Sequence, residues 1–291
     1  MRSAPTLPLL AAILSAFLWG LWWIPIRGLH DMGMSGPWAG VAMVAGALPA
    51  LILFQLLAKN RVRPNRYGIA GAILVGFAVT LYSTSLASTT IIRAVLLFYL
   101  APAWTLAIDC IWFGRRFRAL NALAIALALV GIACVFRGDF GDDAWRWGDV
   151  MALTSGACWA GGAALIFANP RSSIATLSLL SCSVAVLVGV VAAVIAQPLP
   201  PPHVFTDTAV NAIAGGLIYV APIMLATLWG ARRLGATTVT FLLSGEILVG
   251  VASVAILENE PFGWPEVIGT ALIITATLIE VFQPRPPAAP G

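Results

Sequence analysis

The sequence predicts an all-α integral membrane protein with ten transmembrane helices, arranged as a five-plus-five inverted repeat. Three observations carry this prediction: the composition, the spacing of the apolar runs, and a weak internal copy. The chain has 291 residues, 60% of them hydrophobic and only 10% charged, with a mean hydropathy of +0.95. Soluble domains carry about 25% charged residues, so this chain has too few charges to cover a water-facing surface.

Ten apolar runs are long enough to cross about 30 Å of hydrocarbon, which takes about 17 to 25 helical residues. They are residues 7–26, 37–57, 68–87, 92–112, 119–136, 149–168, 174–196, 209–229, 236–257 and 265–282. The first run exceeds the apolar core of a secretory signal, and no small-residue cleavage site follows it, so we expect a retained helix. The loops between the runs are short, which predicts one compact transmembrane domain.

The basic residues are distributed unevenly between the loops. With an even number of spans, both termini lie on the same side. Twelve of the 16 basic residues then fall on that side, namely Arg2, Lys59, Arg61, Arg63, Arg66, Arg115, Arg116, Arg118, Arg171, Arg232, Arg233 and Arg285. Cytoplasmic loops carry such an excess, so we expect both termini in the cytoplasm. The same bias explains the net charge of +4 without a nucleic-acid partner.

A weak internal copy links the two halves of the sequence. Its first matches are 140 residues apart, and later matches are 145 apart. The pairs are Ala12 and Ala152, Ser15 and Ser155, Trp19 and Trp159, then Leu97 and Leu242, Ala107 and Ala252, Ile111 and Ile256. An odd number of spans per copy inverts the second copy in the membrane. We therefore expect a first repeat over residues 1–140 and an inverted second repeat over residues 141–291.

A few residues in this repeat carry a resemblance to a known family. They are Trp19-Gly20 and Trp159-Ala160 in the first span of each copy, Leu100-Ala101-Pro102 in the fourth span and Glu246 in the ninth. This pattern resembles the drug/metabolite transporter superfamily, in its ten-helix EamA-type branch. Arg115 departs from the family, which commonly has an acid there. The Trp-rich, Tyr-bearing composition is most similar to bacterial aromatic amino-acid exporters (YddG-like).

Two ionisable residues are candidates for substrate binding. Glu246 falls near the middle of the ninth span, where a charge is costly and marks either a functional site or a protonated, hydrogen-bonded carboxyl. We expect it to bind a proton, a cation or a substrate ammonium group. Arg93 falls near the external end of the fourth span. It could bind a substrate carboxylate in a bidentate manner, or it could extend to the lipid headgroups.

Aromatic residues inside the spans are the other candidates. Trp19, Tyr82, Tyr99, Trp159 and Tyr219 are expected to line a cavity, because a buried phenol needs a hydrogen-bonding partner. A cavity of this kind suits amino acids with neutral side chains, and also cations. Seven other tryptophans lie at predicted helix ends, and most of them are expected to be anchors at the membrane interface. They are Trp22, Trp23, Trp38, Trp112, Trp145, Trp147 and Trp264.

Prolines mark two expected kinks or hinges, at Pro102 and Pro222, since each removes a backbone donor. No nucleotide-binding loop is present, and the four cysteines fall on four different spans without metal-site spacing. We therefore expect no cofactor and no metal.

Together these features predict a secondary transporter that exports small metabolites across the bacterial inner membrane by alternating access. Amino acids, aromatic or otherwise neutral, are the expected substrates, bound in a central cavity between the repeats. A drug, quaternary-amine or nucleotide-sugar carrier is the alternative on the same scaffold. An intramembrane enzyme is less favoured because the few polar residues are scattered. The lipid bilayer and the small-molecule substrate are the expected partners, and the plan is compatible with a monomer.

Overall fold

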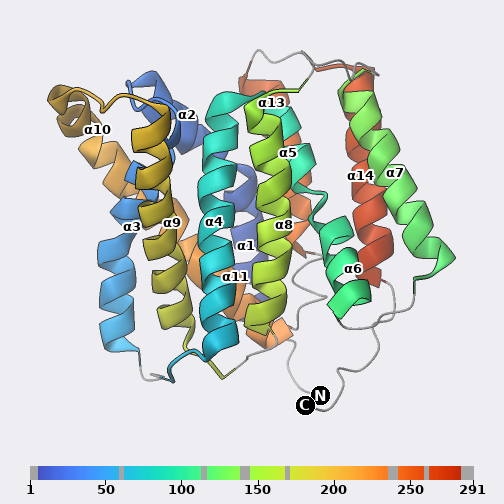
Figure 1. Cartoon of the computed structure of the whole chain (residues 1–291), viewed down its shortest axis with the longest axis horizontal. Helices are drawn as coiled ribbons and strands as arrows, with labels where there is room; N and C mark the ends of the chain where they lie inside the picture. Colours follow the sequence, from blue (N-terminus) through green and yellow to red (C-terminus); the bar gives the residue numbers. More distant parts are fainter. Residues whose placement is uncertain are drawn as a thin grey trace.

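The computed structural model describes residues 6–58, 62–112, 117–137, 145–167, 171–234, 242–258 and 262–282. Its regular elements over these ranges are helices, packed side by side in one bundle (Figure 1). In the first part of the chain they are α1 (Thr6–Gly20), α2 (Trp23–Asp31), α3 (Pro37–Leu57), α4 (Arg66–Ser88), α5 (Ile91–Phe98), α6 (Ala101–Trp112) and α7 (Ala119–Val135).

The second part of the chain continues the bundle. It contains α8 (Trp147–Phe167), α9 (Ile174–Ala196), α10 (Pro202–Gly215), the π-helical segment η1 (Gly216–Val220), α11 (Ala221–Leu234), α13 (Gly245–Leu257) and α14 (Trp264–Phe282). The start of α1 and the end of α14 lie at the same end of the bundle (Figure 1).

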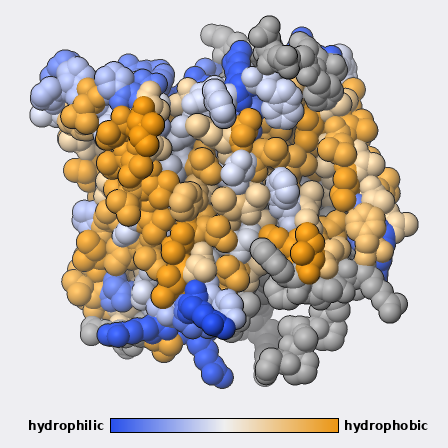
Figure 2. All heavy atoms as spheres, in the orientation of Figure 1, coloured by the Kyte–Doolittle hydropathy of each residue, from blue (hydrophilic) through white to orange (hydrophobic). Residues whose placement is uncertain are grey.

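Six helical stretches in the described residues are long and apolar enough to cross a membrane. They are Thr6–Asp31, Pro37–Leu57, Arg66–Ser88, Trp147–Ile166, Ile174–Ala196 and Pro202–Gly230. Three shorter apolar helices accompany them, over Ala119–Val135, Gly245–Leu257 and Trp264–Ile279. Hydrophobic side chains cover the middle of the bundle in Figure 2, and polar ones gather toward its ends. The chain is thus built as a multi-pass membrane protein.

The predicted span 92–112 is interrupted in the structure. It forms α5 and α6, separated by Tyr99 and Leu100. Pro102 therefore stands in the first turn of α6, where its missing N–H has no helical partner to lose. The expected mid-helix kink is instead a break between two short helices. The sequence did not predict this break, because an apolar run has the same hydropathy whether its helix is continuous or interrupted.

Two other predicted spans also differ from the structure. The first, 7–26, turns at Leu21 and Trp22 and continues as α2 to Asp31. The eighth, 209–229, is longer, running over α10, η1 and α11. Its π-helical segment ends two residues before Pro222. Proline cannot donate to the carbonyl four residues earlier, and its ring crowds that turn, so the backbone widens there.

Helices from the two parts of the chain are interleaved. α4 packs on α8 and α9, α3 packs on α9 and α10, and α7 packs on α14. α1 contacts α11 and α13, whereas α8 contacts α4 and α5. The α4–α8 contact is especially close, because a Cβ at Gly71 would lie 2.9 Å from the carbonyl oxygen of Gly162. A Cβ at Gly162 would lie at the same 2.9 Å from the carbonyl oxygen of Gly71.

Candidate functional site

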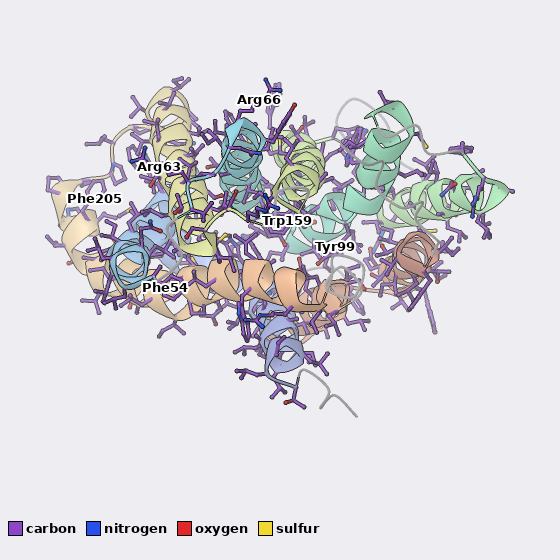
Figure 3. All side chains as sticks on the ribbon, turned by 90° about the horizontal axis from the view of Figure 1, so that it is seen from below. Phe54, Arg63, Arg66, Tyr99, Trp159 and Phe205 are labelled. Carbon is purple, nitrogen blue, oxygen red and sulfur yellow. The ribbon has the colours of Figure 1, made fainter. Side chains whose placement is uncertain are left out.

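Six rings form a continuous aromatic cluster in the middle of the bundle. Its members are Trp19, Trp22, Tyr82, Phe98, Tyr99 and Trp159. Trp19 stacks on Trp22, with ring centroids 4.9 Å apart, and meets the edge of Trp159 at 5.6 Å. Figure 3 shows Tyr99 and Trp159 near the centre of the molecule, whereas Phe54 and Phe205 lie toward its edge.

Phe98 connects the indoles to the phenols of this aromatic cluster. Its ring centroid lies 6.3 Å from that of Trp159, 4.8 Å from that of Tyr82 and 5.5 Å from that of Tyr99. Phe98 ends α5, and its carbonyl oxygen would lie 2.5 Å from a Cβ added at Gly156. The glycine in α8 thus lets the end of α5 approach closely enough for the rings to meet.

Glu246 lies beside the phenols. It stands in the first turn of α13 and is 4% exposed. Its carboxyl group interacts electrostatically with the phenols of Tyr82 and Tyr99, and the Tyr99 phenol lies within reach of it. A Cβ at Gly20 would lie 2.8 Å from the carbonyl oxygen of Glu246. This glycine therefore lets α1 support the start of α13, and the carboxyl group is held in the bundle interior.

Hydroxyl groups orient the two indoles from α1 and its following turn. The Trp19 Nε1–H donates to Thr227 Oγ1 at 3.3 Å, and Ser15 Oγ lies 2.6 Å from the same Thr227 oxygen. The Trp22 Nε1–H donates to Ser83 Oγ at 3.2 Å. These hydrogen bonds connect α1 to α11 and the α1–α2 turn to α4, so they set the geometry of the aromatic cluster.

A recess adjoins the aromatic cluster on the Trp159 side. Residues of α4, α8, α9 and α11 line it, among them Trp159, Ser181, Met224 and Thr227. Its open space admits only water-sized molecules. A second narrow recess has Tyr99 in its wall, between residues of α6, α7 and α14. A larger substrate at either place needs movement of the surrounding side chains or helices.

The structure brings together five of the residues chosen from the sequence: Trp19, Tyr82, Tyr99, Trp159 and Glu246. Trp22, Phe98, Ser83 and Thr227 were missed. Phe, Ser and Thr are common in membrane helices, and nothing in their spacing distinguished these positions. Ser15, which aligns with Ser155 in the internal copy, was the one available signal for the hydroxyl contacts.

Arg93 lies in a different setting. Its Nη1 donates to Asp149 Oδ2 at 3.3 Å, and its guanidinium lies 3.8 Å from the centre of the Phe136 ring. The fully buried Asp149 also accepts from Thr89 Oγ1 at 2.6 Å. Tyr219 is half-buried in η1, and no ring contact joins it to the aromatic cluster within the described residues.

Three of the helix-end tryptophans lie inside the bundle rather than at its surface. Trp22, Trp23 and Trp38 are buried, at 0%, 4% and 6% exposed. The α1–α2 turn directs the first two inward, and the Trp23 Nε1–H donates to Ser253 Oγ at 2.9 Å. Trp147 and Trp264 are 80% and 78% exposed, as an anchor would be, and Trp145 is 38% exposed. The side chain of Trp112 lies outside the described residues.

Part of the chain is similar to a known family of transporters. Residues 6–137 match the model of the EamA-like transporter family. The match covers somewhat less than half of the chain, and over this segment the chain is similar to a family of transporters. No curated protein matches the chain.

A solved structure titled "Crystal structure of protein" resembles the whole chain. The two are 14% identical with a TM-score of 0.64, and the match covers 95% of this chain and 98% of the other. This likeness shows a shared fold over nearly the whole chain.

Proposed function

We propose that this protein exports amino acids with aromatic or other neutral side chains across the bacterial inner membrane. The observation that supports this proposal is the buried Glu246 carboxyl group beside the aromatic cluster. A carboxylate attracts a substrate ammonium group, and ring faces attract both cations and apolar side chains. Polar groups of this kind inside a membrane protein usually face a substrate path.

Alternating access between the two predicted repeats, residues 1–140 and 141–291, is the proposed mechanism. Ser15 and Ser155 support it, because these aligned residues make comparable contacts. Ser15 bonds across to Thr227 of α11, and the Ser155 hydroxyl donates to the Ala78 carbonyl of α4 at 2.7 Å. In this proposal both termini are cytoplasmic, and a single chain supplies the whole site.

In this proposal the helices change direction at two interruptions during transport. Pro102 and Pro222 each stand at the beginning of a helix that follows an irregular segment, the Tyr99–Leu100 break and η1 respectively. The regular α-helical hydrogen-bond pattern is interrupted at both places, so a change of helix direction costs less there than within a regular helix. We propose these two sites as hinges.

An organic cation is the second candidate substrate. The described residues place one carboxyl group against the aromatic cluster, and none of the basic side chains that they include contacts it. Arg93, which was expected to bind a substrate carboxylate, is engaged with Asp149. A quaternary amine needs no partner for a carboxylate, so this arrangement suits it as well.

Transport by the purified protein in proteoliposomes distinguishes the amino-acid substrates from the organic cation. Labelled tryptophan, tyrosine, phenylalanine and leucine are compared with a labelled quaternary amine. We expect saturable movement of the amino acids and its loss in Glu246→Gln. Glu258→Gln, at the other end of the same helix, is the matched control and should transport as the unmodified protein does. Movement of the amine without any amino acid would overturn the amino-acid proposal.

A further inference from the structure

Two helix interruptions meet at Tyr99. One is the break between α5 and α6, where Tyr99 is the first residue after α5. The other precedes α13, whose N-cap is Ser244. The Tyr99 hydroxyl donates to the carbonyl oxygen of Leu243 at 3.2 Å, which bridges the two interruptions. A single phenol thus joins segments that lie 144 residues apart in the sequence.

The same hydroxyl group also interacts with Glu246. A phenol has one O–H donor and can accept through its oxygen lone pairs. It can therefore donate to the Leu243 carbonyl or to the Glu246 carboxyl, but not fully to both. A hydrogen bond to an ionised carboxylate is roughly twice as strong as one between neutral groups. The charge on Glu246 therefore decides which acceptor holds the phenol proton.

In this scheme Glu246 has a hydrogen-bonding partner both when its carboxyl group is protonated and when it is ionised. A protonated carboxyl group donates to the Tyr99 oxygen while Tyr99 donates to Leu243, so the bridge between the interruptions is intact. An ionised carboxylate instead draws the Tyr99 proton toward itself, and the Leu243 carbonyl loses its donor. A substrate ammonium group on the carboxylate neutralises this pull and restores the bridge.

No fixed ion pair sets the charge of Glu246 within the described residues. Of the helices packed on α13, α1 carries no ionisable side chain from Thr6 to Gly20. Arg93 of α5 is paired with Asp149, and Glu266 of α14 is paired with Arg137. The side chain of Glu280 in α14 lies outside the described residues. The titratable groups that face Glu246 are the phenols Tyr82 and Tyr99.

We propose that Tyr99 is a positioning residue whose hydroxyl alternates between Leu243 and Glu246. Through this exchange, the occupancy of Glu246 by a proton or a substrate cation controls the contact between the two interrupted helices. The inference rests on the proposed transport function for its physiological role. The hydrogen-bond exchange itself can be measured without any substrate.

Tyr99→Phe removes the hydroxyl group and keeps the ring that meets Phe98. We expect transport to slow about five- to tenfold, the factor for one net hydrogen bond, and to become nearly independent of pH. Glu246→Gln is expected to lose transport at every pH, and the double variant should lose no more than Glu246→Gln alone. Tyr67→Phe removes an exposed phenol bonded by Arg66 and should leave the pH profile unchanged.

Infrared difference spectra between acidic and basic samples provide the substrate-free measurement. The C=O band that disappears in Glu246→Gln belongs to protonated Glu246. In Tyr99→Phe this band should move to higher frequency, because the carboxyl group has lost its hydrogen-bonding partner. If Tyr99→Phe does not fold, 3-fluorotyrosine at position 99 should move the same band with the ring in place.

Two results would overturn the proposal. One is an unmoved Glu246 band when the residue at position 99 is changed. The other is a wild-type pH profile in Tyr99→Phe. Failure of the proposed amino-acid transport gives another result: labelled amino acids do not move, while the Glu246 band still shifts when residue 99 is changed.

Discussion

Asn121 and Glu266 cap their helices in the same way, although they lie at opposite ends of a packed helix pair. The backbone N–H of Arg118 donates to Asn121 Oδ1 at 2.8 Å, at the start of α7. The backbone N–H of Gly263 donates to Glu266 Oε2 at 2.8 Å, at the start of α14. The two positions are 145 residues apart, the spacing of the later matches in the internal copy. Glu266 in addition accepts from Arg137 at 3.1 Å.

Replacing Asn121 by Ala should destabilise the protein by about 1 kcal/mol, since a helix cap is lost. Asn121→Asp keeps the acceptor but places a carboxyl group at a fully buried position, so it should recover only part of this loss. Glu266→Gln also keeps the acceptor, and it weakens a bond to a largely exposed Arg137 that contributes about 0–1 kcal/mol. Thermal unfolding of the purified variants in one detergent compares them. A larger loss in Glu266→Gln than in Asn121→Ala would contradict this ranking.

Removing the Asp149 carboxylate should destabilise the protein strongly. Asp149→Ala removes the carboxylate that pairs with Arg93 and that accepts hydrogen bonds from Thr89 and from the Arg146 N–H. Breaking a buried pair from one side costs about 3–5 kcal/mol. The double variant Arg93→Met with Asp149→Ala should recover part of this loss, because the guanidinium that the carboxylate neutralised is also removed. Denaturation midpoints of the three proteins test this, and a double variant that is merely additive would count against it.

Adding a methyl group at the α4–α8 contact should prevent normal packing. Gly71→Ala and Gly162→Ala each place a Cβ 2.9 Å from the opposing carbonyl oxygen, so the helices must separate. We expect a sharply reduced yield of monodisperse protein. Gly28→Ala is the matched control, because a Cβ there meets nothing within 4 Å. Equal yields of all three variants would show that this contact does not limit packing.

Thr227→Val should disturb the aromatic cluster without changing its rings. It removes the acceptor of the Trp19 Nε1–H and the partner of Ser15. An unsatisfied buried donor costs about 1–3 kcal/mol, whereas Thr227→Ser keeps the hydroxyl group. The Val variant should unfold at lower temperature and show a changed Trp fluorescence spectrum, and the Ser variant should match the unmodified protein.

Membrane helices with regular backbones were predicted well from the sequence. The predicted spans 37–57 and 174–196 coincide with α3 and α9, because continuous apolar runs with polar flanks define both ends. The breaks at Leu21–Trp22 and Tyr99–Leu100 were missed, since both sides of each break are equally apolar. Where backbone hydrogen bonds stop depends on which carbonyls a neighbouring helix or side chain can satisfy.

The candidate site was likewise predictable from the sequence only in part. Glu246, Tyr82 and Tyr99 stood out because a polar group in an apolar run is unusual. Their convergence depends on two glycines, Gly20 and Gly156, that let α13 and α5 approach their neighbours. Twenty-seven glycines occur in the chain, so these two could not be singled out from composition or spacing.

The α4–α8 contact joins helices that lie on either side of residue 140 in the sequence. An added Cβ at Gly71 or Gly162 would lie 2.9 Å from the opposing carbonyl oxygen, so the two backbones pack without room for a methyl group between them. In the proposed alternating access, a moving body that keeps this contact therefore contains helices from both halves of the chain.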